Sequence, residues 1–421
     1  MQSEEERGPE RLAIDGATPA KQRPTPAMYP GAAVMNAEEE QAALAVARSH
    51  RLFRYYGPGT GPGQVAALEE AFAAAVGVPH ALAVNSGTSA LCTALAAAGI
   101  GPGDEVVVPA YTWVASAMAV AVMGATPVVA EVDDSLTLDP ADVARRTTSR
   151  TRAVLPVHMR GTPADLEPLA AFCRERGVAL IEDVAQADGG SYRGRRLGAW
   201  GDIGCFSLQF TKLLTSGEGG LVTTGDRRLY ERAVIFHDGA GAGAREGFAE
   251  PPFLGMNFRM PELCGAVALA QLRKLPELLG RLRGAAAAIR DGIADLGLRL
   301  RRLPDPAGDC GVCVVFFLPD ARRKPQVLAA LRAERIGCGS LWDPGSRDAH
   351  VYTGWEALMQ RRAHYGPWRP AAPADALVPD ACPRSLELLG RAVHVDVHPL
   401  FSDEDVEGTI RGIRRVVRAL A

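Results

Sequence analysis

One lysine, Lys212, lies in an apolar stretch that begins at Phe206 and ends in a glycine-rich run at residues 217–220. Ser207 precedes this lysine by five residues. Burial in such a stretch would lower the pKa of the amine, because it disfavours the charged form, and would leave a nucleophile able to form a Schiff base. An isolated lysine is more often solvated at the surface. The interpretation therefore depends on the groups that accompany Lys212.

Three of these groups end or follow apolar runs typical of buried strands. They are Trp113, Asp183 and Ser207. Ligands of parallel sheets bind beyond the carboxyl ends of the strands, so these side chains are expected at one edge, together with Lys212. Each residue alone has an ordinary structural explanation: Trp113 in the core, Asp183 as a helix cap, Ser207 at a strand end. Their coincidence favours a site.

A Ser-Gly-Thr-Ser turn at residues 86–89 separates an apolar segment at 80–84 from an alanine-rich segment at 90–98. A strand, a turn and a helix in this order leave free backbone N–H groups at the helix N-terminus, which attract anions. Phosphate is the expected ligand. A simple helix cap by Ser86 or Thr88 explains the turn equally well when it is taken alone.

A lysine, a carboxylate, an aromatic side chain and an anion site are what pyridoxal 5'-phosphate requires. The lysine forms the imine, the carboxylate keeps the ring nitrogen protonated, and the aromatic side chain stacks on the ring. A cation beside a carboxylate lowers its pKa by about 1–3 units, so Asp183 is expected to stay charged. The sequence therefore predicts a pyridoxal phosphate enzyme.

Strands and helices alternate from residue 80 onward, and the strands are continuous runs of Val, Ile and Leu. This pattern predicts an α/β fold with a mostly parallel sheet covered on both faces. Strands are expected at 80–84, 105–108, 126–132, 153–157, 178–182, 203–207 and 221–224. Helices are expected at 37–49, 64–76, 90–98, 114–123, 166–176, 227–236, 275–296 and 325–335, and from residue 403.

The 421 residues, of which 47% are hydrophobic, can bury a large core. We expect a loosely ordered N-terminal segment at 1–30, a pyridoxal-phosphate-binding large domain at 31–290 and a small C-terminal α/β domain at 291–421. Residues 343–380 are irregular and rich in Pro, Trp, Tyr and His. A long loop of this kind is expected to help close the site.

Composition argues against several classes of partner. The formal net charge of −3 gives no electrostatic reason to expect nucleic acid or an anionic membrane. The longest apolar run, 114–130, is short for a membrane span and is interrupted by Gly124 and Pro127. Eight scattered cysteines and no recognisable signal peptide predict a cytoplasmic location.

Two further patterns have the spacing of metal sites. Cys310 and Cys313 form a lone CxxC pair followed by a strand pattern, for which we favour a structural role. His394, Asp396 and His398 alternate and would share one face of a strand, but no fourth ligand is identifiable. No metal is therefore expected.

Charged residues near the expected ligand edge leave alternatives open. Arg160 and His158 follow the strand expected at 153–157, which makes substrate recognition plausible, although packing explains His158 equally well. Arg259 could hold a donor carboxylate bidentately, but an ordinary interface salt bridge is the better explanation.

Several motifs together resemble the sugar and cyclitol aminotransferases of the DegT/DnrJ/EryC1/StrS family. The resemblance runs from about residue 12 to the C-terminus and is strongest between residues 85 and 272. It implies the fold type I architecture of pyridoxal phosphate enzymes. The matching motifs lie at 86–91, 109–113, 182–187, 206–212, 217–220 and 255–260.

The resemblance assigns the residues around the cofactor ring. By this resemblance Lys212 forms the Schiff base with pyridoxal phosphate, and Asp183 pairs with the pyridine nitrogen. Gln186 would contact the ring near its hydroxyl group, and Trp113 would stack on the ring.

The resemblance also assigns the phosphate site. Gly87, Thr88 and Ser207 would bind the phosphate, and Asn257 would reach the phosphate of the cofactor in a neighbouring subunit. A homodimer with shared active sites is therefore expected.

The same resemblance implies transfer of an amino group from L-glutamine, or glutamate, to a keto-cyclitol or keto-sugar in aminoglycoside-type biosynthesis. Segments 12–19, 51–56 and 157–161 look like those of glutamine-dependent scyllo-inosose aminotransferases. Some relatives with histidine in place of the lysine are dehydratases, so Lys212 favours transamination. The alternatives are a pyridoxal phosphate dehydratase or aminohydroxybenzoate synthase, a nucleotide-sugar aminotransferase, and a non-catalytic accessory protein.

Overall fold

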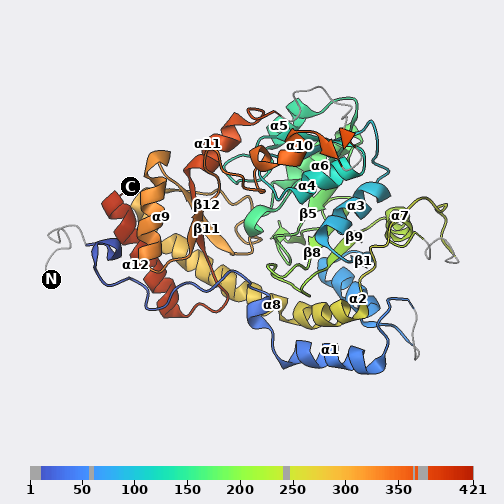
Figure 1. Ribbon diagram of the computed structural model, residues 1–421, viewed down its shortest axis with the longest axis horizontal. Helices are drawn as coiled ribbons and strands as arrows, with labels where there is room; N and C mark the ends of the chain where they lie inside the picture. Colours follow the sequence, from blue (N-terminus) through green and yellow to red (C-terminus); the bar gives the residue numbers. More distant parts are fainter. Residues whose placement is uncertain (1–10, 56–60, 240–246, 364–365, 368–377, 421) are drawn as a thin grey trace.

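A computed structural model describes residues 11–55, 61–239, 247–363, 366–367 and 378–420 of the chain. Figure 1 shows a large sheet with helices on both faces, a smaller sheet at one end of the molecule, and the long helix α8 running between the two. Residue 56, the last of the segment 51–56 compared above with scyllo-inosose aminotransferases, and residues 364–365 and 368–377 of the expected closing loop lie outside the described residues.

The large sheet confirms the predicted α/β architecture. Its strand order is β1-β9-β8-β5-β4-β2-β3. Only β9 runs antiparallel to its neighbours, and the remaining pairs are parallel. Helices cover both faces, so the strands are buried and near-continuously apolar. The strands are β1 (His80–Val84), β2 (Glu105–Pro109), β3 (Thr126–Ala130), β4 (Thr151–Val154), β5 (Ala179–Asp183), β8 (Ile203–Ser207) and β9 (Gly220–Thr224).

The helices around this sheet begin and end close to the expected residues. One of them, α5, was not expected, although Asp139 caps it through the N–H of Ala141 and Pro140 occupies its first turn, both of which are helix-start signals. The helices are α1 (Ala37–Ser49), α2 (Gln64–Val76), α3 (Gly87–Ala97), α4 (Ala115–Val122), α5 (Pro140–Arg146), α6 (Leu166–Arg176) and α7 (Arg227–His237). A short hairpin, β6 (Ser191–Tyr192) and β7 (Arg195–Arg196), follows β5.

Helix α8 spans Glu262–Gly292 and therefore starts well before the expected residue 275. The predicted start was wrong, because the helix already begins at Glu262 and continues through Pro276. Pro276 is exposed, and its ring removes one intrahelical hydrogen bond, the one to the carbonyl of Leu272. This continuity lets a single helix pack against α1, α2, β11 and α12.

The small sheet has the order β10-β11-β15-β12 and is antiparallel throughout. Its strands are β10 (Arg299–Leu300), β11 (Cys313–Phe317), β12 (Cys338–Ser340) and β15 (Ala392–Asp396). The C-terminal helices are α9 (Lys324–Ala333), α10 (Glu356–Met359), α11 (Pro383–Arg391) and α12 (Asp403–Leu420), and a two-stranded ribbon joins β13 (Arg362–Ala363) to β14 (Gly366–Pro367). The domain boundary at residue 290 stays a prediction.

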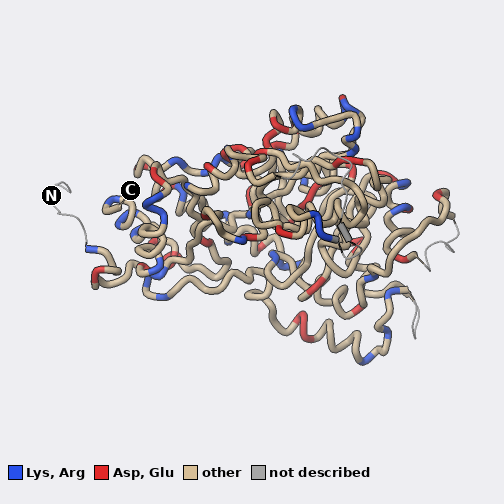
Figure 2. The backbone as a smooth tube through the Cα atoms, turned by 45° about the horizontal axis from the view of Figure 1, so that its top comes forward, with Lys and Arg blue, Asp and Glu red and all other residues tan. Residues whose placement is uncertain are grey.

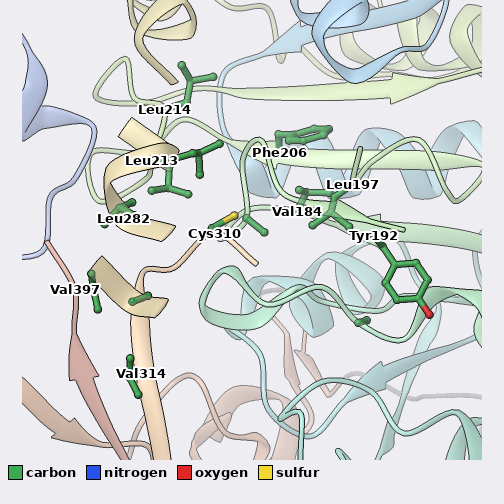
Figure 3. Packing of buried hydrophobic residues seen from close by; sticks show 14 of the residues in the cluster. Val184, Tyr192, Leu197, Phe206, Leu213, Leu214, Leu282, Cys310, Val314 and Val397 are labelled. Carbon is green, nitrogen blue, oxygen red and sulfur yellow. The ribbon is translucent and has the colours of Figure 1, made fainter. Parts of the chain in front are cut away.

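The two sheets share two clusters of buried hydrophobic residues. One of these clusters includes Phe206 of β8, Leu282 of α8 and Val314 of β11. Figure 3 shows these side chains together with Leu213 and Leu214, the two residues that directly follow the predicted catalytic lysine, Lys212. The loop that carries Lys212 is therefore anchored in the main core.

Charged residues are distributed as the composition predicts. Figure 2 shows basic and acidic residues interspersed across the molecule, in line with 46 Lys and Arg against 49 Asp and Glu. Within the described ranges, no helix is both long and apolar enough to cross a lipid bilayer.

The described part of the N-terminal segment contacts the small domain. Glu334, which is fully buried, accepts hydrogen bonds from the backbone N–H groups of Ala13 (3.0 Å) and Ala20 (2.7 Å). Its carboxylate also lies 3.2 Å from Arg415 Nη1. These contacts join the described residues of this segment to the small domain, and the loose order expected for residues 1–30 stays a prediction. Residues 1–10 lie outside the described part.

We predict that Glu334→Ala lowers the stability of the protein by about 3 kcal/mol, because removal of one partner leaves Arg415 and two backbone groups uncompensated. Thermal unfolding followed by calorimetry measures the change. Glu404→Ala, an exposed substitution in the first turn of α12, is the matched control and should cost less than about 1 kcal/mol. Equal effects of the two substitutions would contradict the role of Glu334.

Candidate active site

A cavity of about 420 Å³ opens at the carboxyl ends of the central strands. Seven of the eight predicted site residues line it: Gly87, Thr88, Trp113, Asp183, Gln186, Ser207 and Lys212. The structure thus brings together residues that are up to 125 positions apart, from Gly87 to Lys212. Their individual roles toward a cofactor stay predictions.

Lys212 lies in the loop between β8 and β9. Its backbone N–H donates to Gln209 O (2.9 Å), and its carbonyl accepts from Gly31 N (3.1 Å). The next two residues, Leu213 and Leu214, are buried. Both the backbone and the neighbouring side chains therefore fix where the lysine enters the cavity.

The glycine-rich run after Lys212 is the expected turn back into the sheet. Leu208 N donates to Gly219 O (2.8 Å), and Gly217 N donates to Thr215 Oγ1 (3.0 Å). Gly217 has φ +84°, a conformation that other residues adopt only at a cost. The chain then re-enters the sheet at Gly220, the first residue of β9.

The amine of Lys212 has the electrostatic properties expected of a nucleophile. Burial lowers its pKa, and the negative charges of Asp188, Asp183 and Glu218 oppose that shift. The expected direction of the shift is confirmed. A lowered pKa increases the fraction of neutral amine near neutral pH.

Asp183 is buried at the end of β5, where its carboxylate is held by two donors. Ser116 Oγ donates to Oδ2 (2.8 Å) and Ala185 N donates to Oδ1 (3.0 Å). Burial raises the pKa of Asp183, and these two hydrogen bonds and the charge of Lys212 act against that rise. The sequence predicted a lowered pKa beside a ring cation, which the chain by itself does not contain. A positively charged ligand at this position would keep Asp183 ionised.

The turn before α3 has both a capping and an anion-binding geometry. Ser86 Oγ accepts from Ser89 N (3.0 Å), so Ser86 caps the helix. Among the described residues, no hydrogen bond reaches the N–H groups of Gly87 and Thr88. A Cβ on Gly87 would lie 2.7 Å from Ser207 Cβ. Free N–H groups and a hydroxyl therefore meet where only glycine leaves room for an anion.

Trp113 and His350 form the outer wall of the cavity. Trp113 is 49% exposed, and its ring centroid lies 4.9 Å from that of His350. His350 Nδ1 lies 2.9 Å from Asp348 Oδ1, and its carbonyl accepts from Thr112 N (2.8 Å). The irregular segment 343–380 was expected to close the site, but sequence reasoning missed His350 within it, because no regular pattern marks one residue there.

Asp188 is a buried carboxyl group that the sequence did not single out. It is fully buried, and among the described residues neither carboxylate oxygen has a hydrogen-bond partner. Burial raises its pKa to about 8, and the charge of Lys212 acts against the rise. Asp188 lies outside the residues that line the cavity, and its negative charge acts to raise the pKa of Lys212.

The alternatives left open for His158 and Arg259 are resolved by their partners. His158 is fully buried, with Nε2 3.2 Å from Glu182 Oε2 and Nδ1 accepting from Ala164 N. It therefore packs within the domain. Arg259 Nη1 pairs within the chain with Asp238 (2.5 Å), which favours the salt-bridge explanation over a donor-binding role.

Asn257 is exposed and does not line the cavity of its own chain. Its backbone pairs with Asp238 as an isolated antiparallel bridge. The predicted contact with the cofactor of a neighbouring subunit is not tested by one chain.

The two metal-like patterns have ordinary partners. His394 Nδ1 lies 3.1 Å from Asp396 Oδ1, and Cys310 and Cys313 are buried free thiols. Over the described ranges, no three His, Cys, Asp or Glu side chains are grouped so that they could hold a metal ion.

These residues fit pyridoxal phosphate on structural grounds. The free N–H groups of Gly87 and Thr88 suit a phosphate, and the buried carboxylate of Asp183 lacks a cation of the kind that the protonated ring nitrogen supplies. The amine of Lys212 shares their cavity. The N–H groups match the phosphate of pyridoxal phosphate, Asp183 matches its ring nitrogen, and Lys212 matches its aldehyde.

The structure is similar to solved enzymes of known class. It superimposes on 3-amino-5-hydroxybenzoic acid synthase with a TM-score of 0.77 and 28% identity, over 91% of this chain and 97% of that one. The fold is therefore that of the fold type I pyridoxal-phosphate-dependent transferases. A model of the DegT/DnrJ/EryC1/StrS aminotransferase family matches residues 34–414, and the chain belongs to this family.

Curated relatives include enzymes with different acceptors. L-glutamine:2-deoxy-scyllo-inosose aminotransferase of Micromonospora echinospora is 42% identical over 55% of this chain. GDP-perosamine synthase of Caulobacter vibrioides is 40% identical over 56% of this chain. The matched regions span only 58% and 63% of these two relatives.

We predict that Gly87→Ala weakens binding of pyridoxal phosphate at least about tenfold, because its methyl group collides with Ser207 and disrupts a charge-assisted contact. Titration of the cofactor-free protein with pyridoxal phosphate, followed by fluorescence, measures the dissociation constant. Gly225→Ala has open space around its Cβ and serves as control. An unchanged affinity of Gly87→Ala for pyridoxal phosphate would contradict binding of the phosphate at this turn.

Proposed function

We propose that the protein is a pyridoxal-phosphate-dependent aminotransferase that moves an amino group from L-glutamine, or L-glutamate, to the ketone of a cyclitol or sugar. One observation carries this proposal: the amine of Lys212 shares a cavity with the buried carboxylate of Asp183 and the anion turn at Gly87. Membership in an aminotransferase family supports the reaction class.

The chain's own residues divide the work. Pyridoxal phosphate, when bound, supplies an electron sink and a carrier for the amine. Lys212 Nζ would hold the cofactor before the donor binds. With the donor bound, Lys212 Nζ would accept the proton from the donor's α-carbon, and the lowered pKa of the amine suits that role. Asp183 would hold a proton on the ring nitrogen.

The acceptor is proposed to be a ring ketone in aminoglycoside-type natural-product biosynthesis. The relative from Micromonospora echinospora carries scyllo-inosose and glutamine in its name, and segments 12–19, 51–56 and 157–161 resemble such enzymes. A nucleotide-sugar acceptor is the second candidate, because the GDP-perosamine synthase is nearly as similar. A dehydratase or an aminohydroxybenzoate synthase is the third candidate function, because 3-amino-5-hydroxybenzoic acid synthase has the same fold as this chain.

A homodimer with shared active sites is part of the proposal. Asn257 is exposed beside Leu254 and Met256, whose side chains are 95% and 53% exposed. Exposed apolar side chains next to a predicted phosphate ligand suit a surface that a second copy covers. The cytoplasm remains the proposed location, in keeping with eight free cysteines.

The test of the function is a panel of keto-cyclitols, keto-sugars and nucleoside diphosphate keto-sugars, each incubated with L-glutamine and the loaded protein. We expect an amine product from a keto-cyclitol or free keto-sugar, identified by mass spectrometry, and none from Lys212→Ala, because that variant lacks the nucleophile and base. Amination of nucleotide-linked ketones alone would select the second candidate. Loss of water without amine transfer would select the third.

We predict that Asp183→Asn folds normally but exchanges the α-proton of L-glutamine at least about 100-fold more slowly. Asparagine keeps nearly the same shape, its amide oxygen can still accept from Ala185 N–H, and its NH2 group can donate to Ser116 Oγ, but it cannot hold the ring nitrogen protonated. Proton exchange in deuterated water, measured by NMR, gives the rate. Exchange at the wild-type rate would exclude the ring-nitrogen role.

A further inference from the structure

A second cavity of about 250 Å³ adjoins the first. The two share Gln186, Thr211, Lys212 and His350 as lining residues. Beyond these, the second cavity is lined by Arg160 and by Asp396 of the small domain, among others. A molecule whose amine reaches Lys212 can therefore place its remaining atoms beside Arg160.

Arg160 is held firmly in this position. Its Nε donates to Tyr111 Oη (2.9 Å), and its backbone N–H donates to Gln186 Oε1 (3.0 Å). Tyr111 is itself buried. The backbone of Arg160 is left-handed, with φ 51° and ψ 42°. Non-glycine residues seldom adopt this strained conformation, and such residues cluster at functional sites.

The outer part of the guanidinium group is not used by the protein. Across the described residues, Arg160 makes no ion pair, and its two terminal nitrogens have no hydrogen-bond partner. The negative charge of Asp396 faces Arg160, but Asp396 is hydrogen-bonded to His394 Nδ1 at 3.1 Å. A guanidinium with a purely structural role would be expected to have all its donors paired.

We propose that Arg160 binds the α-carboxylate of the amino donor in this second cavity. The inference rests on the proposed aminotransferase function. In an α-amino acid the carboxylate is attached to the same carbon as the amine. A donor whose amine reaches Lys212 therefore brings its carboxylate into the cavity that Arg160 lines. The planar fork of arginine matches a carboxylate bidentately.

Two other arginines near the site have partners within the protein. Arg259, considered from the sequence for the same role, pairs with Asp238. Arg301 is 1% exposed and donates to Met159 O. A neutral ketone acceptor has no carboxylate, and the same terminal N–H groups can then donate to its hydroxyl groups, which lets one site serve both half-reactions.

The test compares L-glutamine with 4-aminobutanamide, which is glutamine without its α-carboxylate. The donor half-reaction is followed by the absorbance of the loaded enzyme in single turnovers, and kcat/KM is measured for each amine. We expect the preference for L-glutamine to fall about 10- to 100-fold in Arg160→Gln, because charge-assisted hydrogen bonds are lost only with the carboxylate-bearing amine. Arg160→Lys keeps the charge without the fork and should lose less.

Arg322→Gln, which removes a 91% exposed arginine of the small domain, is the matched control and should keep the wild-type preference. Equal slowing of both amines in Arg160→Gln would show a merely structural role and overturn the inference. An unchanged preference in Arg160→Gln would overturn it as well. A wild-type protein that converts neither amine would overturn the proposed function and this inference with it.

Discussion

The site depends on the burial of the amine of Lys212 away from solvent and close to the carboxyl groups of Asp183 and Asp188. Burial lowers the pKa of this lysine, whereas it raises the pKa of Asp183 and brings that of Asp188 to about 8. In the absence of a ligand, burial therefore disfavours the charged form of the lysine amine and also the charged forms of the two carboxyl groups. A ligand that carries a ring cation and consumes the amine relieves both conditions.

The fold meets this requirement by letting separate elements end at one place. Strand β5 ends at Asp183, β8 ends at Ser207, and α3 begins at Gly87. The loop after β8 then brings Lys212 back over these ends, held by Leu213 and Leu214 in a core that both sheets share. Asp396 of the small sheet completes the lining of the second cavity, where it faces Arg160. The two cavities meet at Lys212, which lines both.

Much of this arrangement could be predicted from the sequence because it depends on strand ends. A run of Val, Ile and Leu that stops at a polar residue identifies both a strand and its ligand edge, which is why Asp183 and Ser207 were found. His350 was not found, since it lies in an irregular segment whose position is set by backbone pairing with residues 110–114. Asp188 was missed because only the packing of the folded chain removes its partners. The early start of α8 was not predicted, because whether a helix continues through a proline such as Pro276 depends on its exposure in the folded chain.

The central claim is that Lys212 is the group that reacts with pyridoxal phosphate. Borohydride reduction of the protein in the presence of this cofactor, followed by proteolysis and mass spectrometry, locates the modified lysine directly. The account predicts that the peptide containing Lys212 carries the reduced cofactor and that other lysines remain unmodified at one equivalent of cofactor. A label on another lysine, or no label under these conditions, would contradict it.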